Sequence, residues 1–253
     1  MDLKLAGMRA VVTGGTRGIG RAIVETFVDE GAHVAFCARG ADDVAAAEKA
    51  LSERGGTVFG SVVDVGQADA LSGWVRRAAE QLGGIDIVVA NISALAIPES
   101  EENWQASFNV DLMHTVRTVT AAMPHLERSE AGSIVAVSSV SGREVDFASG
   151  PYGTMKTALI GYIQGLAHHL AAKGIRANTV SPGNTFFEGG VWENIKENMP
   201  DVYATQIALN PTGRMGTPQE VAAAVVFLAS PVASRISGTN LAVDGALPRG
   251  VQL

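Results

Sequence analysis

The sequence contains a single cysteine, Cys37, so a disulfide within the chain is excluded and a cytoplasmic location is favoured. Cys37 lies in an apolar segment, which favours a buried structural thiol. No run of about eighteen apolar residues occurs, so we expect no membrane span. The first residues, Met1–Gly7, also lack the apolar core of a secretion signal.

Basic residues are fewer than acidic ones. The chain has 19 Lys and Arg and 26 Asp and Glu, which gives a net charge of −7. Proteins that bind nucleic acids usually present a basic face, so we expect no nucleic-acid partner. The chain shows no internal repeat, low-complexity tract or linker, and its 253 residues fit one α/β domain spanning 1–253.

Short apolar segments alternate with helical patterns along the whole chain. We predict strands at Arg9–Thr13, His33–Ala38, Thr57–Val63, Asp86–Ala90, Ser133–Ser138, Ile175–Val180 and Asn240–Val243. Long helical patterns cover Glu101–Glu127 and Tyr152–Lys173. This order predicts a Rossmann-type, doubly wound parallel sheet of about seven strands with helices on both faces. Ligands of such sheets bind at the carboxyl ends of the strands.

A glycine-rich loop, Thr13–Gly20, follows the first predicted strand and opens a helix that runs to about Glu30. Its spacing is T-G-x-x-x-G-x-G. Strand, glycine loop and helix together bring backbone N–H groups to a pyrophosphate, although glycines also make ordinary turns. The expected dinucleotide contacts in this loop are Gly14, Thr16, Arg17, Gly18, Ile19 and Gly20.

The second predicted strand ends in Arg39, where a site that prefers NAD usually offers an acid to the ribose 2′-hydroxyl. Arg17 and Arg39 could together hold a 2′-phosphate, which favours NADP(H) and leaves NAD(H) as the alternative. Both arginines could instead be merely solvated. Asp64 and Val65 follow the third strand and could face the adenine, but Asp64 could equally cap the next helix.

Tyr152 and Lys156 lie four residues apart in a predicted helix and therefore share one helix face. A nearby ammonium favours the phenolate form of a tyrosine, and Ser138 and Ser139 lie shortly before the pair. Such a site can exchange a proton with a carbonyl or alcohol oxygen, but it needs a cofactor for the hydride. Taken alone, a Tyr-x-x-x-Lys spacing is also common on solvated helices.

With these motifs together, the chain resembles the single-domain branch of the short-chain dehydrogenase/reductase family over essentially its whole length. The residues that carry the resemblance are Thr13–Gly20, Asp64-Val65, Asn91, Asn109, Ser139, Tyr152, Lys156, Pro182-Gly183 and Val243-Asp244-Gly245.

The resemblance implies a role for each matching residue. Tyr152 would be the general acid or base, Lys156 would bind the nicotinamide ribose, and Ser139 would orient the substrate oxygen. Asn109 would hold a water linked to Lys156, although a mid-helix asparagine can also simply bend its helix. The remaining expected cofactor contacts are Asn91, Tyr152 itself, Pro182 and Gly183, and the family implies a homotetramer or homodimer.

Three features depart from the family pattern. Ala90-Asn91-Ile92-Ser93 replaces the usual N-N-A-G and puts a β-branched residue beside the expected adenine–ribose rim. The segment from Ser93 to Trp104 is short, so one pocket wall is expected to be more open. Thr185 follows Pro182-Gly183 without the usual apolar spacing, which puts its role as a cofactor ligand in doubt.

Residues 184–201 form the expected substrate lid, with apolar side chains that could line a pocket or only pack the lid onto the body. His168 and His169 have no matching ligands at metal-binding spacing, so no metal is expected. We predict an enzyme that interconverts a small-molecule ketone and a secondary alcohol with NADP(H). The alternatives are a 3-oxoacyl-thioester reductase, an NAD-dependent alcohol dehydrogenase and a non-catalytic dinucleotide-binding regulator.

Overall fold

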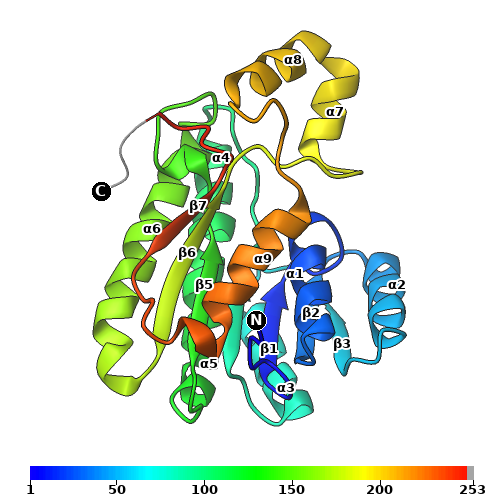
Figure 1. Ribbon diagram of the computed structural model, residues 1–253, viewed down its shortest axis with the longest axis vertical. Helices are drawn as coiled ribbons and strands as arrows, with labels where there is room; N and C mark the ends of the chain where they lie inside the picture. Colours follow the sequence, from blue (N-terminus) through cyan, green and yellow to red (C-terminus); the bar gives the residue numbers. More distant parts are fainter. Residues whose placement is uncertain (250–253) are drawn as a thin grey trace.

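The computed structural model describes residues 1–249, which form a seven-stranded parallel sheet flanked by helices (Figure 1). The strand order is β3-β2-β1-β4-β5-β6-β7. The strands are β1 (Arg9–Thr13), β2 (His33–Ala38), β3 (Val58–Val62), β4 (Ile87–Ala90), β5 (Ser133–Val137), β6 (Arg176–Pro182) and β7 (Asn240–Val243). The predicted Rossmann-type, doubly wound sheet is confirmed.

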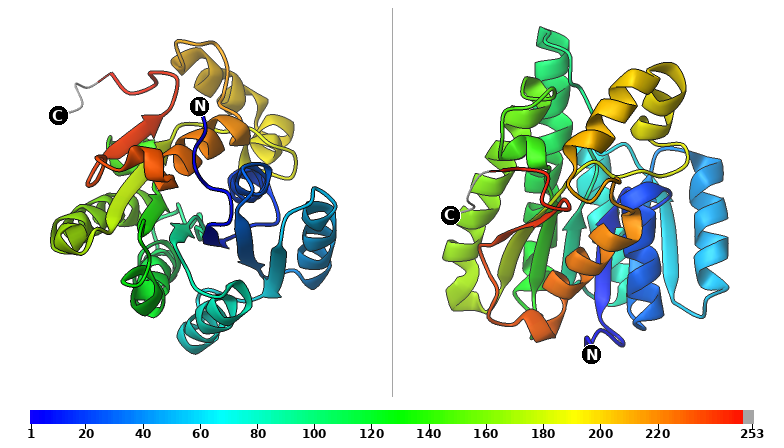
Figure 2. Two further views of the ribbon diagram at one scale, coloured as in Figure 1. Left: turned by 60° about the horizontal axis from the view of Figure 1, so that its bottom comes forward. Right: turned by 45° about the horizontal axis from the view of Figure 1, so that its top comes forward.

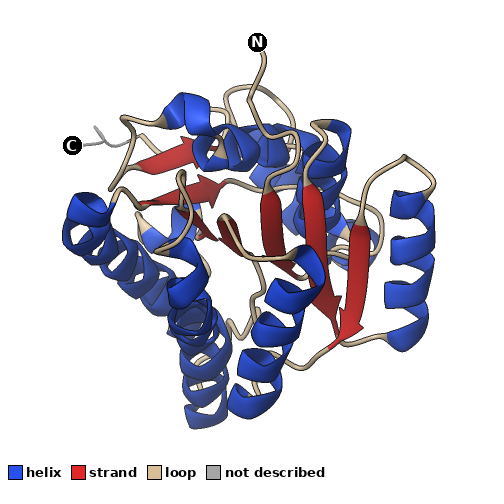
Figure 3. Cartoon of the chain, turned by 90° about the horizontal axis from the view of Figure 1, so that it is seen from below, coloured by secondary structure: helices blue, strands red, loops and turns tan. Residues whose placement is uncertain are grey.

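Helices cover both faces of the sheet, as the views in Figures 2 and 3 show. One face packs against α1 (Gly18–Asp29), α2 (Ala41–Ser52) and α9 (Pro218–Ala229). The other packs against α3 (Ala68–Leu82), α5 (His114–Leu126) and α6 (Pro151–Leu170). The shorter helices are α4 (Glu101–Ser107), α7 (Val191–Asn198) and α8 (Pro200–Leu209), with one-turn segments η2 (Val140–Gly142), η3 (Ala171–Lys173) and η4 (Pro231–Ala233).

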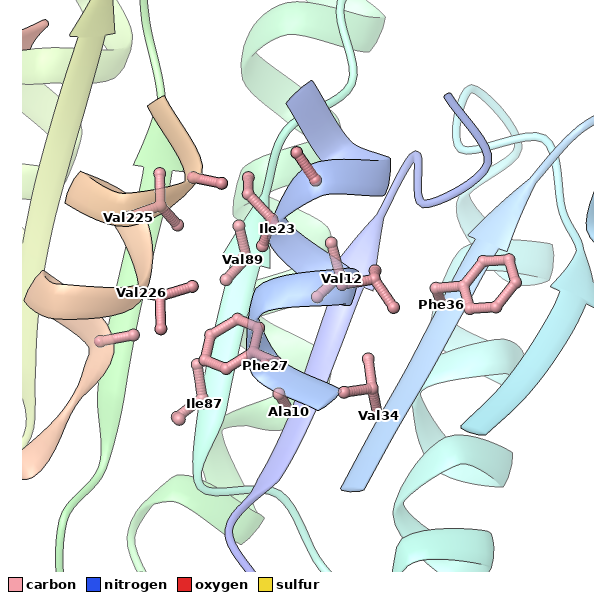
Figure 4. Packing of buried hydrophobic residues seen from close by; sticks show 14 of the residues in the cluster. Ala10, Val12, Ile23, Phe27, Val34, Phe36, Ile87, Val89, Val225 and Val226 are labelled. Atoms are coloured by element: carbon pink, nitrogen blue, oxygen red, sulfur yellow. The ribbon is translucent and has the colours of Figure 1, made fainter. Parts of the chain in front are cut away.

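The central strands are apolar along their length because both of their faces are covered. In β1, Val12 points into the cluster with Ile23 and Phe27 of α1, whereas its neighbour Val11 points into the opposite cluster. Figure 4 shows the first of these clusters, in which Val225 of α9 packs beside α1. Alternate side chains of one strand thus anchor both helical layers to the same sheet.

The predicted strand bounds agree with the structure to within two residues, and β1, β2 and β7 match at both ends. The predicted long helix Glu101–Glu127 is not continuous. It divides into α4, a π-helical segment η1 (Phe108–Met113) and α5. In η1 the N–H of His114 bonds to the carbonyl of Asn109, five residues back, so one extra residue fits into the turn.

The sheet reverses its strand order between β1 and β4, which pair in parallel. Connections from these strands run to opposite sides and leave a crevice at their carboxyl ends. The glycine loop follows β1 and Asn91 follows β4, so both lie at this crevice. Helices α7 and α8 stand over the same end of the molecule, at the top of Figure 1.

Candidate active site

A cavity of about 770 Å³ runs from the glycine loop to the start of α6 and passes beneath α7. It is lined by most of the residues that the sequence singles out, namely Gly14, Thr16, Arg17, Ile19, Gly20, Arg39, Asp64, Val65, Asn91, Ser139, Tyr152, Lys156, Pro182 and Gly183. Gly18 and Asn109 are not part of the lining. Residues at the carboxyl ends of six strands, β1 to β6, thus converge on one space.

The glycine loop is compact, and it leaves the N–H groups at the amino-terminal end of α1 uncapped. The N–H groups of Gly14 and Gly15 both bond to the carbonyl of Cys37, and a Cβ at Gly20 would collide with the carbonyl of Gly14. No side chain caps α1 at Arg17, so its first N–H groups remain available to an anion. These residues fit the diphosphate of a dinucleotide.

The cavity end beside β2 carries two arginines. Arg39 is exposed at the end of β2, and Arg17 donates from Nη1 to the carbonyl of Gly189 at 3.3 Å. Asp64 accepts a hydrogen bond from the N–H of Gly66 at 2.9 Å. It does not cap the next helix, the alternative role considered for it, because α3 begins at Ala68 with Gln67 at its N-cap. Asp43, which the sequence analysis did not single out, also lines this end.

Asn91 ties β4 to β1. Its N–H donates to Thr13 Oγ1 at 3.0 Å and its side-chain amide donates to the carbonyl of Thr13 at 3.2 Å. The next residue, Ile92, packs over Gly14, where an added Cβ would lie 2.8 Å from Ile92 Cγ1. The departure at Ile92 therefore closes one side of the glycine loop with an apolar side chain.

Ser138 and Ser139 have different partners. Ser138 donates to the backbone carbonyl of Lys156 at 2.9 Å, whereas Ser139 accepts from the N–H of Ser141 at 3.1 Å and lines the cavity. A Cβ at Gly142 would lie 2.8 Å from the backbone of Lys156, so glycine lets this turn approach α6 closely. The Ser139 hydroxyl keeps its own proton for a ligand in the cavity.

Tyr152 lies half-buried in the first turn of α6, one helical turn before the buried Lys156. The Lys156 ammonium is 5.6 Å from the centroid of the Tyr152 ring. The predicted pair therefore shares one wall with Ser139. This arrangement places a phenol, a cation and a hydroxyl around the same space.

Lys156 also contacts an acid that the sequence analysis missed. Its Nζ lies 3.3 Å from Oδ1 of Asp111 and donates to the carbonyl of Val137 at 3.1 Å. Asn109 points elsewhere: its amide donates to the carbonyl of Gly66 at 3.0 Å and accepts from Arg117 at 2.7 Å. The predicted water-holding role of Asn109 stays a prediction, and the side chain that reaches Lys156 from η1 is that of Asp111.

A buried histidine fixes η1 against the sheet. The Nδ1 of His114 lies 2.5 Å from the carbonyl of Val110, an acceptor, so Nδ1 carries the proton. Nε2 then accepts from the hydroxyl of Thr13 at 3.2 Å. Burial lowers the pKa of His114 to about 4, and the positive charge of Lys156 also contributes. His114 is therefore neutral at ordinary pH and positions the turn that carries Asp111.

The expected lid is built from aromatic contacts. The ring of Trp192 in α7 meets that of Phe147 edge to face at 6.0 Å, and Phe186 meets Tyr203 of α8 at 6.2 Å. Phe187 lies against Gly18, where an added Cβ would be 2.6 Å from the ring. The aromatic segment continues beyond residue 201, since α8 runs to Leu209. Phe147, Phe187 and Trp192 thus both pack this segment onto the body and line the cavity, whereas Phe186 and Tyr203 pack against each other and are not part of the lining.

Within residues 1–249, no helix is long and apolar enough to cross a membrane. In the same part of the chain, no group of three or more His, Cys, Asp or Glu side chains is arranged to hold a metal ion.

Comparison with known proteins defines the class. A family model described as enoyl-(acyl carrier protein) reductase matches residues 14–247. Isoepoxydon dehydrogenase patN of Penicillium expansum is 42% identical over 257 residues, covering 98% of this chain and 97% of that protein. The 3-oxoacyl-[acyl-carrier-protein] reductase FabG of Vibrio harveyi is 33% identical, covering 97% of this chain and 99% of that protein.

A solved structure agrees with these likenesses. L-sorbose reductase of Gluconobacter frateurii, solved in complex with NADPH and L-sorbose, matches with a TM-score of 0.91 and 29% identity. The match covers 99% of this chain and 100% of that chain. The fold and the site define a dinucleotide-dependent oxidoreductase. The chain belongs to the short-chain dehydrogenase/reductase family, whose NAD(P)-dependent enzymes act on CH–OH and C=O groups.

Proposed function

We propose that this enzyme interconverts a ketone and a secondary alcohol with NADP(H), and that Tyr152 is its general acid and base. The observation that carries the proposal is the shared cavity wall, where Tyr152, Lys156 and Ser139 meet. Gly18 is also a proposed cofactor contact, because its N–H is the first of α1, although the residue does not line the cavity.

Each of these side chains performs one part of the chemistry. The Ser139 hydroxyl donates a hydrogen bond to the substrate oxygen and holds it beside the phenol. In reduction, the Tyr152 proton passes to that oxygen as negative charge develops there, and in oxidation the phenolate takes the proton back. The Lys156 ammonium stabilises the phenolate in both directions. A bound nicotinamide supplies or accepts the hydride.

Arg17 and Arg39 support NADP(H) over NAD(H). Both line the same cavity end, and guanidinium groups bind phosphate oxygens with charge-assisted hydrogen bonds. The matching sorbose reductase was solved with NADPH. Asp43 at the same end is the residue that would favour an unphosphorylated ribose.

The substrate end of the cavity is mainly apolar. Phe147, Phe187 and Trp192 line it together with Leu95 and Ile97, so an apolar ketone or alcohol fits this wall. The likeness to isoepoxydon dehydrogenase supports a small alcohol as substrate. The likeness to FabG favours a second candidate, a 3-oxoacyl thioester.

A small substrate panel separates these candidates. Purified protein is mixed with NADPH or NADH and with cyclohexanone, acetophenone or acetoacetyl-coenzyme A, and cofactor absorbance is followed. We expect NADPH-dependent reduction of a simple ketone, and cyclohexanol should be oxidised in the reverse direction. Turnover of the thioester alone would establish the second candidate, whereas cofactor binding without turnover of any compound would support a non-catalytic regulator.

A further inference from the structure

The strongest unexplained feature of the site is a buried ion pair. Lys156 and Asp111 are 2% and 0% exposed, and Nζ and Oδ1 lie 3.3 Å apart. The second carboxylate oxygen, Oδ2, accepts from the N–H of Ala94 at 3.3 Å. Oδ1 has no hydrogen-bond donor among the described residues, so the ammonium is its partner. An ion pair this far from water interacts strongly.

The other charges around this pair do not replace Asp111. His114, in the next turn, is neutral above about pH 4 because burial lowers its pKa to that value. Arg117 is bonded to Asn109 on the same helical segment. From α6 the facing groups are Lys156 itself and the Tyr152 phenol. The negative charge closest to the catalytic lysine is therefore that of Asp111.

We propose that Asp111 is a positioning residue that sets the protonation of the Tyr152–Lys156 pair. The inference rests on the proposed function and extends it. A buried lysine tends to lose its proton, and the Asp111 carboxylate opposes that loss. When the pair releases one proton, Asp111 therefore directs the loss to the phenol, which leaves the productive phenolate–ammonium state.

The same charge has a second effect on the pair. A neighbouring carboxylate disfavours loss of a proton from both Tyr152 and Lys156, so the pair releases its first proton at higher pH than it would beside an amide. Replacing Asp111 by asparagine should therefore move this release to lower pH. It should also reduce the share of molecules that hold the proton on lysine. The first effect raises activity at low pH because the phenolate forms earlier, and the second lowers the maximal activity. A residue with a merely structural role would produce neither effect.

The direct test is an ultraviolet titration of the phenolate in the cofactor-free protein. The spectrum of each Tyr152→Phe partner is subtracted from that of its parent protein, which removes the signals of Tyr162 and Tyr203. In Asp111→Asn, the Tyr152 phenolate should appear about 1 pH unit lower than in the wild type. The phenolate absorbance should also level off at a smaller value. The acidic limb of kcat/KM for NADP⁺-dependent cyclohexanol oxidation should move in the same direction, while its plateau falls.

Asp86→Asn is the matched control. Asp86 is also buried and paired, with Nη2 of Arg9 at 2.6 Å, but it precedes β4 at the opposite end from the site. Its substitution should leave the Tyr152 titration in place. An unmoved or more alkaline titration in Asp111→Asn would overturn the inference. Activity that persists in Tyr152→Phe would instead overturn the proposed function, so the two failures are distinct.

Asp111→Asn leaves a buried ammonium without its partner and could fold poorly. The double variant Asp111→Asn with Lys156→Met then decides the matter. If the carboxylate serves Lys156, removing both charges should recover most of the Tm that Asp111→Asn loses. If the losses of the two single variants simply add, Asp111 does not act through Lys156 and the inference fails.

Discussion

The guanidinium of Arg17 donates to the backbone carbonyl of Gly189 at 3.3 Å, so the loop after β1 is joined to the lid 172 residues further along the chain. Phe187 lies against Gly18 of the same loop. The loop that we propose for the cofactor diphosphate and the proposed lid therefore contact each other directly. A substitution in the glycine loop should therefore alter the mobility of residues 184–201.

Arg17→Ala should loosen the lid in the free protein. The lost hydrogen bond contributes about 1 kcal/mol, which corresponds to roughly a fivefold larger open population. Trypsin cleavage after Lys196 in α7 should speed up by the same factor. Arg21→Ala, which breaks the pair with Glu25 one turn along α1, is the control and should not change that rate. Equal cleavage rates in both variants would contradict the contact.

Arg39→Ala should separate the two cofactors. Loss of charge-assisted bonds to a 2′-phosphate should raise the Kd for NADPH roughly 10- to 100-fold and leave that for NADH unchanged. Nicotinamide fluorescence titrations measure both constants. Arg54→Ala, whose guanidinium pairs with Asp29 on the surface, controls for net charge. Wild-type binding that already favours NADH would instead point to Asp43 as the ribose ligand.

Stability should fall in acid because of His114. Its pKa is about 4 in the folded protein and about 6.5 when unfolded, so the unfolded chain binds the extra proton between these values. The contribution, about 3 kcal/mol, is fully present above pH ~6.5 and is lost progressively as the pH falls toward ~4. Urea unfolding of the wild type and His114→Gln measures it. The variant should show a shallower decline over this range, and parallel curves would exclude the assignment.

Cys37 should be inert in the native enzyme. It is 0% exposed, and burial raises the pKa of its thiol to about 12. An aromatic disulfide reagent at pH ~8 should therefore leave the folded protein unmodified, because the thiolate is the reactive form. The same reagent should modify Cys37 fully in denaturant. Rapid native labelling would show that β2 opens locally.

The fold follows from the sequence more completely than the site does. Strands such as β1 and β2 are short apolar runs bounded by glycines and polar residues, and burial on both faces makes that pattern distinct. The glycine loop, Ser139, Tyr152 and Lys156 are placed by their order along the chain. Each follows or faces the carboxyl end of a predicted strand, and parallel strands bring those ends together.

The acid beside Lys156 was harder to predict. A regular helix over Glu101–Glu127 gives no sign of the extra residue that η1 inserts, and this residue alters which side chain faces α6. The sequence does contain one indication, because the polar residues Ser107, Asp111 and Thr115 recur every four positions in an otherwise amphipathic helical pattern. All three side chains are buried in the structure. Partners of buried polar groups come from distant segments, so the spacing predicts burial without naming Lys156 as the contact.

The substrate lid at residues 184–201 stays a prediction, and the aromatic contacts of this segment extend beyond it. Glycines and aromatic residues mark residues 184–201, yet the sequence does not show that Phe186 pairs with Tyr203 of α8. That contact depends on the angle between α7 and α8, which tertiary packing decides.

The most direct test of the account is the turnover of Tyr152→Phe measured together with its affinity for NADPH. The substitution removes the phenolic oxygen but keeps the ring beside Lys156. We predict a loss in kcat of about 10²- to 10⁴-fold with an unchanged Kd for NADPH, because the proton donor is lost while the binding surface remains. Retained turnover would contradict the assignment of Tyr152 as the acid and base of this enzyme.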